Sequence, residues 1–105
     1  MGGDTELLGE LAAMFVKESP ALLQGIRTAI ECGESGSLEH AAHKLKGVVG
    51  EFRAHAAYER AAKLETLGGE YKIDGAIEVF DALTEEVDRV REFLTAFTGD
   101  VLQNT

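Results

Sequence analysis

The sequence predicts an all-α protein, an up-and-down antiparallel four-helix bundle with an additional short N-terminal helix. Apolar residues recur at helical spacing in several stretches, and no stretch alternates apolar and polar residues as a strand would. The loops between these stretches are only a few residues long, which favours antiparallel neighbours. With 105 residues, 45% of them hydrophobic, the chain is long enough for one small domain with one core.

Glycine, proline and serine divide the chain into five expected helices. These helices cover approximately residues 5–17, 20–30, 38–52, 55–67 and 74–98. The first break falls at Ser19 and Pro20, because serine caps a helix well and proline suits the first helical position. We expect a bundle domain over residues 5–98, between flexible segments at residues 1–4 and 99–105.

The composition excludes several classes of function. The formal net charge is −9, whereas non-specific nucleic-acid binding requires clustered lysine and arginine. No stretch approaches 18 consecutive apolar residues, so no membrane contact is expected. The single cysteine, Cys32, excludes an internal disulfide and favours a reducing, cytoplasmic location.

The third expected helix carries a histidine opposite a clean apolar stripe. At about 100° per residue, its apolar residues fall on the side of the helix away from His43. These residues are Leu38, Ala41, Leu45, Val48, Val49, Phe52 and Ala56. His43 is therefore predicted to be exposed, and His40, Lys46, Gly47 and Gly50 share its face.

This face suits a histidine that another protein modifies. A glycine weakens a helix interior by about 1 kcal/mol relative to alanine, and Gly47 and Gly50 fill no gap in the core. Their effect is to remove side chains beside the imidazole, so that a bulky partner can approach His43. Lys46 adds a positive charge one turn away, and an exposed neutral imidazole is a competent nucleophile. An exposed histidine on a helix is often only a surface residue, and it is the combination that favours a chemical role.

At these residues the sequence resembles the histidine-containing phosphotransfer (HPt) domain family. The pattern His-x-Leu-Lys-Gly of that family reads here as residues 43–47, HKLKG. The segment LAAMFVKESPALLQGIRTAI resembles the entry helices of the family, and AAKLE resembles the end of the helix that follows the histidine. The long final helix also fits, so the resemblance covers nearly the whole chain.

The resemblance implies a phosphohistidine carrier without its own ATP site. His43 would accept a phosphoryl group from an aspartate of one response-regulator receiver domain and pass it to another. Lys46 would stabilise the phosphoryl group, and Gly47, Gly50, His40 and Lys44 would form the face on which the receiver docks. No cofactor is expected in this chain, since the Mg²⁺ for transfer would belong to the receiver. We expect a monomer, either free-standing or part of a hybrid sensor histidine kinase.

Two features differ from the commonest pattern. Many members of the family have glycine ten residues after the histidine, where this chain has Arg53, so that the bend is made differently or the helix runs further. The GEF segment at residues 50–52 is closer to the phosphorylated N-terminal (P1) domain of chemotaxis-type kinases. In those domains a glutamate on the next helix orients the histidine, and the matching position here is Glu65, which antiparallel pairing sets level with residue 43.

Three other interpretations compete with phosphotransfer. His40 and His43 could share a metal ion, but a zinc site requires three or four ligands and only the ordinary surface carboxylates Glu39 and Glu51 are near in sequence. A hydrolase or transferase with its own pocket lacks a histidine near Cys32. A helical adaptor that binds a partner without phosphorylation keeps the same fold, and replacing His43 with glutamine would separate it from a carrier.

Overall fold

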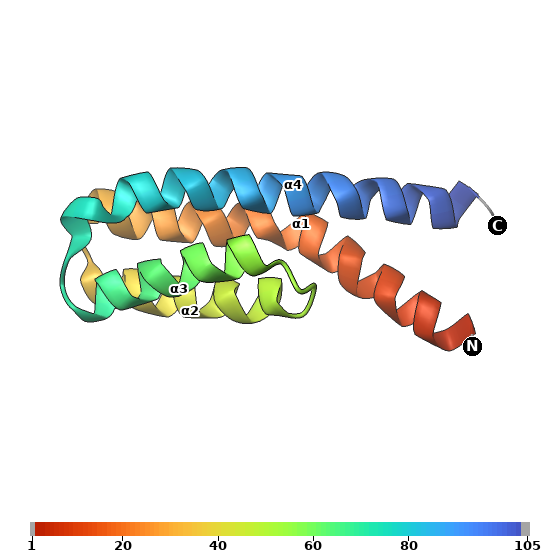
Figure 1. Cartoon of the computed structure of the whole chain (residues 1–105), viewed down its shortest axis with the longest axis horizontal. Coiled ribbons are helices and arrows are strands. Elements are labelled where there is room, and N and C mark those ends of the chain that lie inside the picture. Colours follow the sequence, from red (N-terminus) through yellow and green to blue (C-terminus); the bar gives the residue numbers. More distant parts are fainter. Residues whose placement is uncertain (1, 104–105) are drawn as a thin grey trace.

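The computed structural model describes the backbone of residues 2–103 and the side chains of residues 9–96, and over this range it is an all-helical bundle without strands. Four α-helices follow one another along the chain and lie antiparallel to their neighbours (Figure 1). They are α1 (Gly2–Cys32), α2 (Ser35–Gly50), α3 (His55–Gly69) and α4 (Ala76–Gln103), with a short 3-10 turn, η1 (Ile73–Gly75), before α4. The predicted fold class and antiparallel bundle are confirmed.

The additional N-terminal helix was wrongly predicted, because α1 continues through Pro20 as one helix of 31 residues. Proline removes one hydrogen bond from a helix interior and crowds the preceding turn. Here one buried stripe runs along α1 on both sides of the proline and includes Phe15, Ser19, Leu23 and Ile26. Burial of this stripe therefore keeps the helix intact, while the N-terminal part of α1 bends away from α4 (Figure 1).

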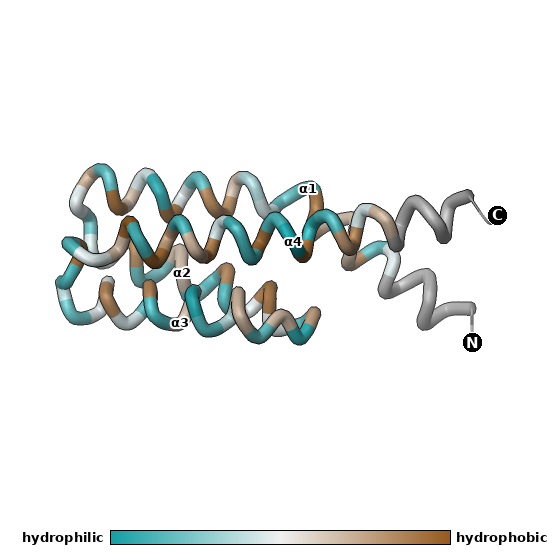
Figure 2. The backbone as a smooth tube through the Cα atoms, turned by 45° about the horizontal axis from the view of Figure 1, so that its top comes forward, coloured by the Kyte–Doolittle hydropathy of each residue, from teal (hydrophilic) through white to brown (hydrophobic). Residues whose placement is uncertain are grey.

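The core is built from one buried stripe on each helix. Along each helix, hydrophobic and hydrophilic residues alternate in bands at the spacing of helical turns (Figure 2). The largest apolar side chains that are fully buried are Ile26, Leu38, Leu45, Val49, Leu64, Leu83 and Val87. The stripe predicted on α2 is confirmed for Leu38, Leu45 and Val49, whereas Ala56 is exposed because it belongs to α3.

The outer helices are longer than the sequence indicated. α1 begins at Gly2 and α4 continues past Gly99 to Gln103, so segments 1–4 and 99–105 are mostly helical within the described backbone. Residues 1, 104 and 105 lie outside the described residues. α2 and α3 have only 16 and 15 residues, so they form a shorter hairpin against one half of the α1–α4 pair (Figure 1).

Two backbone features shape the α2–α3 hairpin. Arg53 lies in the turn between the helices with a φ of 55°, a left-handed conformation that glycine adopts more easily. The bend is therefore made at Arg53 itself, and an arginine takes the strained position that the resemblance assigned to glycine. At the other end, Gly68 lets the two helices approach closely, since a Cβ there would lie 2.6 Å from the backbone nitrogen of Glu39. Gly68 is thus a packing residue near the end of α3.

Candidate functional site

His43 lies on the outer surface of α2, and 66% of its side chain is exposed. The buried residues Leu38, Ala42, Leu45 and Val49 hold the opposite side of α2 in the core. The predicted exposure of His43 is confirmed, and so is the apolar stripe that fixes it. α2 thus presents the imidazole to solvent from a rigid, well-packed element.

Glu65 of α3 contacts both His43 and Lys46. One carboxylate oxygen, Oε2, lies 2.5 Å from Nδ1 of His43, and the other, Oε1, accepts a hydrogen bond of 2.6 Å from Nζ of Lys46. Only 22% of the Glu65 side chain and 23% of the Lys46 side chain are exposed. The antiparallel pairing of α2 and α3 therefore joins the three residues in one polar cluster beneath the exposed imidazole.

The contact between Lys46 and Glu65 changes the pKa of each partner. The hydrogen bond from Lys46 lowers the pKa of Glu65 below its usual 4.5, helped by the hydrogen bond with His43 and opposed by desolvation. The same hydrogen bond raises the pKa of Lys46 above its usual 10.5. Glu65 is consequently a carboxylate and Lys46 an ammonium ion at neutral pH.

The carboxylate decides which nitrogen of a neutral imidazole is free. A carboxylate only accepts hydrogen bonds, so Nδ1 of His43 must carry the proton and donate it to Glu65. In a neutral ring the proton on Nδ1 leaves the lone pair on Nε2. The cluster therefore holds the imidazole in the tautomer whose Nε2 can act as a nucleophile or as a ligand.

The two glycines on this face differ in what surrounds them. A Cβ added to Gly47 would have no described atom of another element within 4 Å, so packing inside the domain does not require glycine there. A Cβ on Gly50 would lie 3.5 Å from two atoms of the Tyr58 ring. His40 and Lys44 are exposed on α2, as predicted. Gly47 thus adjoins open space, whereas Gly50 adjoins an aromatic side chain of α3.

Sequence reasoning missed Tyr58 and misplaced Lys46. Lys46 was expected on the solvent face, but side chains from α3 cover most of it, and its Nζ lies 5.9 Å from the centroid of the Tyr58 ring. Tyr58 is 42% exposed and stands seven residues before Glu65, on the same face of α3. Since Glu65 was matched with His43, its seven-residue spacing from Tyr58 could have predicted that Tyr58 also faces α2.

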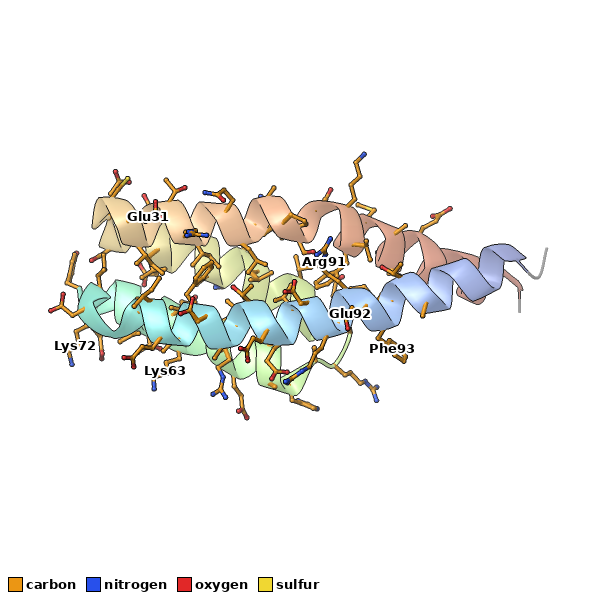
Figure 3. The ribbon with its side chains drawn as sticks, turned by 90° about the horizontal axis from the view of Figure 1, so that it is seen from above. Glu31, Lys63, Lys72, Arg91, Glu92 and Phe93 are labelled. Carbon is orange, nitrogen blue, oxygen red and sulfur yellow. The ribbon has the colours of Figure 1, made fainter. Side chains whose placement is uncertain are left out.

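Other parts of the described chain contribute nothing to this cluster. Within residues 9–96, no group of three or more His, Cys, Asp or Glu side chains could hold a metal ion. Cys32 is an exposed thiol at the end of α1. A hollow of about 650 Å³ lies between the α2–α3 turn and α4, and its lining does not include His43, Lys46 or Glu65. Phe93, which lines it, projects away from α1 (Figure 3). No described helix is long and apolar enough to cross a membrane.

Comparisons with known proteins agree with this geometry. Residues 10–93 match the Hpt domain family. The fold resembles the crystal structure of histidine-containing phosphotransfer protein B from Pseudomonas aeruginosa PAO1, with a TM-score of 0.84 and 22% sequence identity over 88% of this chain and 80% of that one. A comparison with curated proteins gave no match. The family match covers well over half of the chain, so this chain belongs to the Hpt domain family. Members of this family carry phosphoryl groups in phosphorelays.

Proposed function

We propose that the chain carries a phosphoryl group on Nε2 of His43 between aspartates of response-regulator receiver domains. The observation that carries this proposal is the 2.5 Å contact between Nδ1 of His43 and the Glu65 carboxylate. It leaves the Nε2 lone pair directed away from the contact, on a side chain that is two-thirds exposed. An acceptor that must reach into the active site of another protein requires both properties.

In the accepting step, the lone pair of Nε2 attacks the phosphorus atom of an aspartyl phosphate on the receiver. A P–N bond forms, and the electron pair of the breaking P–O bond returns to the aspartate. Nδ1 keeps its proton, so this domain supplies no general base. The ring gains a positive charge, which the Glu65 carboxylate balances, and this electrostatic support is the contribution that phosphoryl transfer requires most.

In the donating step, a carboxylate oxygen of the second receiver attacks phosphorus and the P–N bond breaks. The electron pair returns to Nε2, which restores the neutral imidazole with its proton on Nδ1. Lys46, bound to the same carboxylate, brings a positive charge close to the phosphoryl group in both directions. The proton on Nδ1 stays in place throughout, so the cycle returns the domain to its starting state.

The test uses a receiver domain charged with a small phosphodonor, which is mixed with this protein or with its His43→Gln variant. Acid-labile, base-stable phosphate on the unmodified chain alone is the expected result. Label on both proteins would place the acceptor at another residue. No label from several different receivers would contradict the proposed donor and favour a helical adaptor.

A second candidate is a phosphorylated domain of a chemotaxis-type kinase, which accepts phosphate from ATP through a separate catalytic domain. The hydrogen bond between Glu65 and His43 favours it, since the resemblance to such P1 domains implies the same contact from the next helix. The two candidates differ in the donor. Label that appears on His43 with a kinase catalytic domain and ATP, and with no phosphorylated receiver, would select the second.

A further inference from the structure

Tyr58 faces α2 in the same pairing that brings Glu65 to His43. Gly50 follows His43 by seven residues on α2, and Tyr58 precedes Glu65 by seven residues on α3. Because the helices are antiparallel, the two pairs lie two turns apart along one interface. The 3.5 Å separation between a Cβ on Gly50 and the Tyr58 ring confirms that the ring lies against α2 there.

Lys46 lies between these two pairs. Its Nζ is 2.6 Å from Oε1 of Glu65 and 5.9 Å from the centroid of the Tyr58 ring. Lysine is normally one of the most exposed residue types, but here only 23% of the side chain is exposed. The ammonium group therefore has an anionic partner on one side and an aromatic face on the other.

We propose that Tyr58 is a positioning residue for Lys46, and that its ring and the Glu65 carboxylate together hold the ammonium group beside His43. The inference rests on the proposed phosphotransfer function. A cation within about 6 Å of an aromatic centroid is attracted by the negative face of the ring. A lysine side chain has many rotamers, and the ring restricts Lys46 to those that keep its charge near the imidazole.

The experiment compares Tyr58→Phe, which keeps the ring, with Tyr58→Leu, which removes it. Tyr71→Leu is the matched control, since Tyr71 is 82% exposed and lies in the connection after α3. The first readout is the NMR shift of the ε-methylene protons of Lys46, which a neighbouring ring displaces. The second is the rate at which each variant accepts phosphate from a phosphorylated receiver. This rate is measured once with the native Lys46 and once in a Lys46→Met background.

We expect Tyr58→Leu to remove the ring-induced shift and to slow transfer about two- to fivefold, the range typical of an exposed cation–π contact. Tyr58→Phe and Tyr71→Leu should leave the Lys46 shift and the transfer rate as they are. In the Lys46→Met background, Tyr58→Leu should have no further effect on the rate.

Three results would overturn the inference. An unchanged Lys46 shift in Tyr58→Leu would mean that the ring does not hold the ammonium. An unchanged rate would mean that holding it does not matter. A loss of rate that persists in the Lys46→Met background would assign Tyr58 to direct contact with the receiver. Because the NMR readout requires no phosphate, failure of the proposed function would be seen separately, as a lack of label on the unmodified chain.

Discussion

Replacing Gly47 with alanine should make the domain more stable and, at the same time, slow phosphoryl transfer. Glycine in a helix interior is less stable than alanine by about 1 kcal/mol. A Cβ at Gly47 would meet no described atom of another element within 4 Å, so no clash opposes that gain. For a domain of this size, 1 kcal/mol corresponds to a rise in Tm of roughly 4–8 °C.

The same methyl group lies one turn from His43, on the surface where the proposed receiver docks. A methyl group forced into a well-packed interface costs about 1–3 kcal/mol, which would slow transfer at low receiver concentration by roughly 5- to 150-fold. Gly47→Gln should block transfer further while the domain stays folded. Thermal unfolding measures the first effect, and transfer of label from a phosphorylated receiver measures the second.

Gly9→Ala is the control for this pair of effects. Gly9 is also a helical glycine whose added Cβ would meet no described atom within 4 Å, but it lies in the half of α1 that extends beyond the α2–α3 hairpin. It should gain similar stability and transfer phosphate at the normal rate. If Gly47→Gln accepts phosphate as fast as the unmodified protein, then open space at residue 47 has no role in docking, and the steric reasoning is wrong.

Three further outcomes follow from the hairpin. Gly68→Ala should lower the free energy of unfolding by about 1–3 kcal/mol in urea denaturation, since its Cβ would lie 2.6 Å from the Glu39 backbone nitrogen; an unchanged midpoint would show that α2 and α3 separate easily. Arg53→Gly should raise the free energy of unfolding by about 1 kcal/mol, because glycine adopts a positive φ without strain; a loss of stability would mean that the arginine side chain makes a contact of greater value. The pKa of Glu65 is lower in the folded chain than its usual 4.5, so its stabilising contribution is present above that value and is lost as the pH falls through the folded pKa. Between neutral pH and about pH 3, the unmodified protein should therefore lose more stability than Glu65→Gln, and parallel losses would show that the Lys46–Glu65 contact does not couple to folding.

The fold class was predictable because apolar residues recur at helical spacing wherever a helix buries one side in the core. The continuity of α1 through Pro20 was not predictable, because local preference and tertiary packing disagree there. Ser19 interrupts the apolar pattern in sequence, yet it occupies a buried position between Phe15 and Leu23. A small polar residue in the stripe concealed the continuity of α1, and proline then appeared to end a helix that the core holds together.

The site was predictable to the extent that one helix defines it. The angular positions of His43 and Gly47 on α2 follow from sequence alone, since the apolar stripe fixes the opposite face. What α3 contributes depends on how the two helices pair. Glu65 was identified from the resemblance and from its position along the chain. The cover of Lys46 by Tyr58 could not be predicted in this way, because it depends on the distance between the two helices. Gly50 was accordingly assigned to the docking face, although the structure sets an aromatic ring beside it.

The seven-residue spacing of Tyr58 and Glu65 along α3 has a consequence for how such a domain can vary. One residue added to the helix between them would turn the two side chains about 100° further apart around the helix axis, so that they could no longer both face α2. An insertion after Gly69 would leave both in place, because it lies beyond the paired segment. The chemistry of His43 is thus encoded in a length as well as in residue identities. Two chains with the same key residues at different spacings along α3 are not expected to be equivalent phosphate carriers.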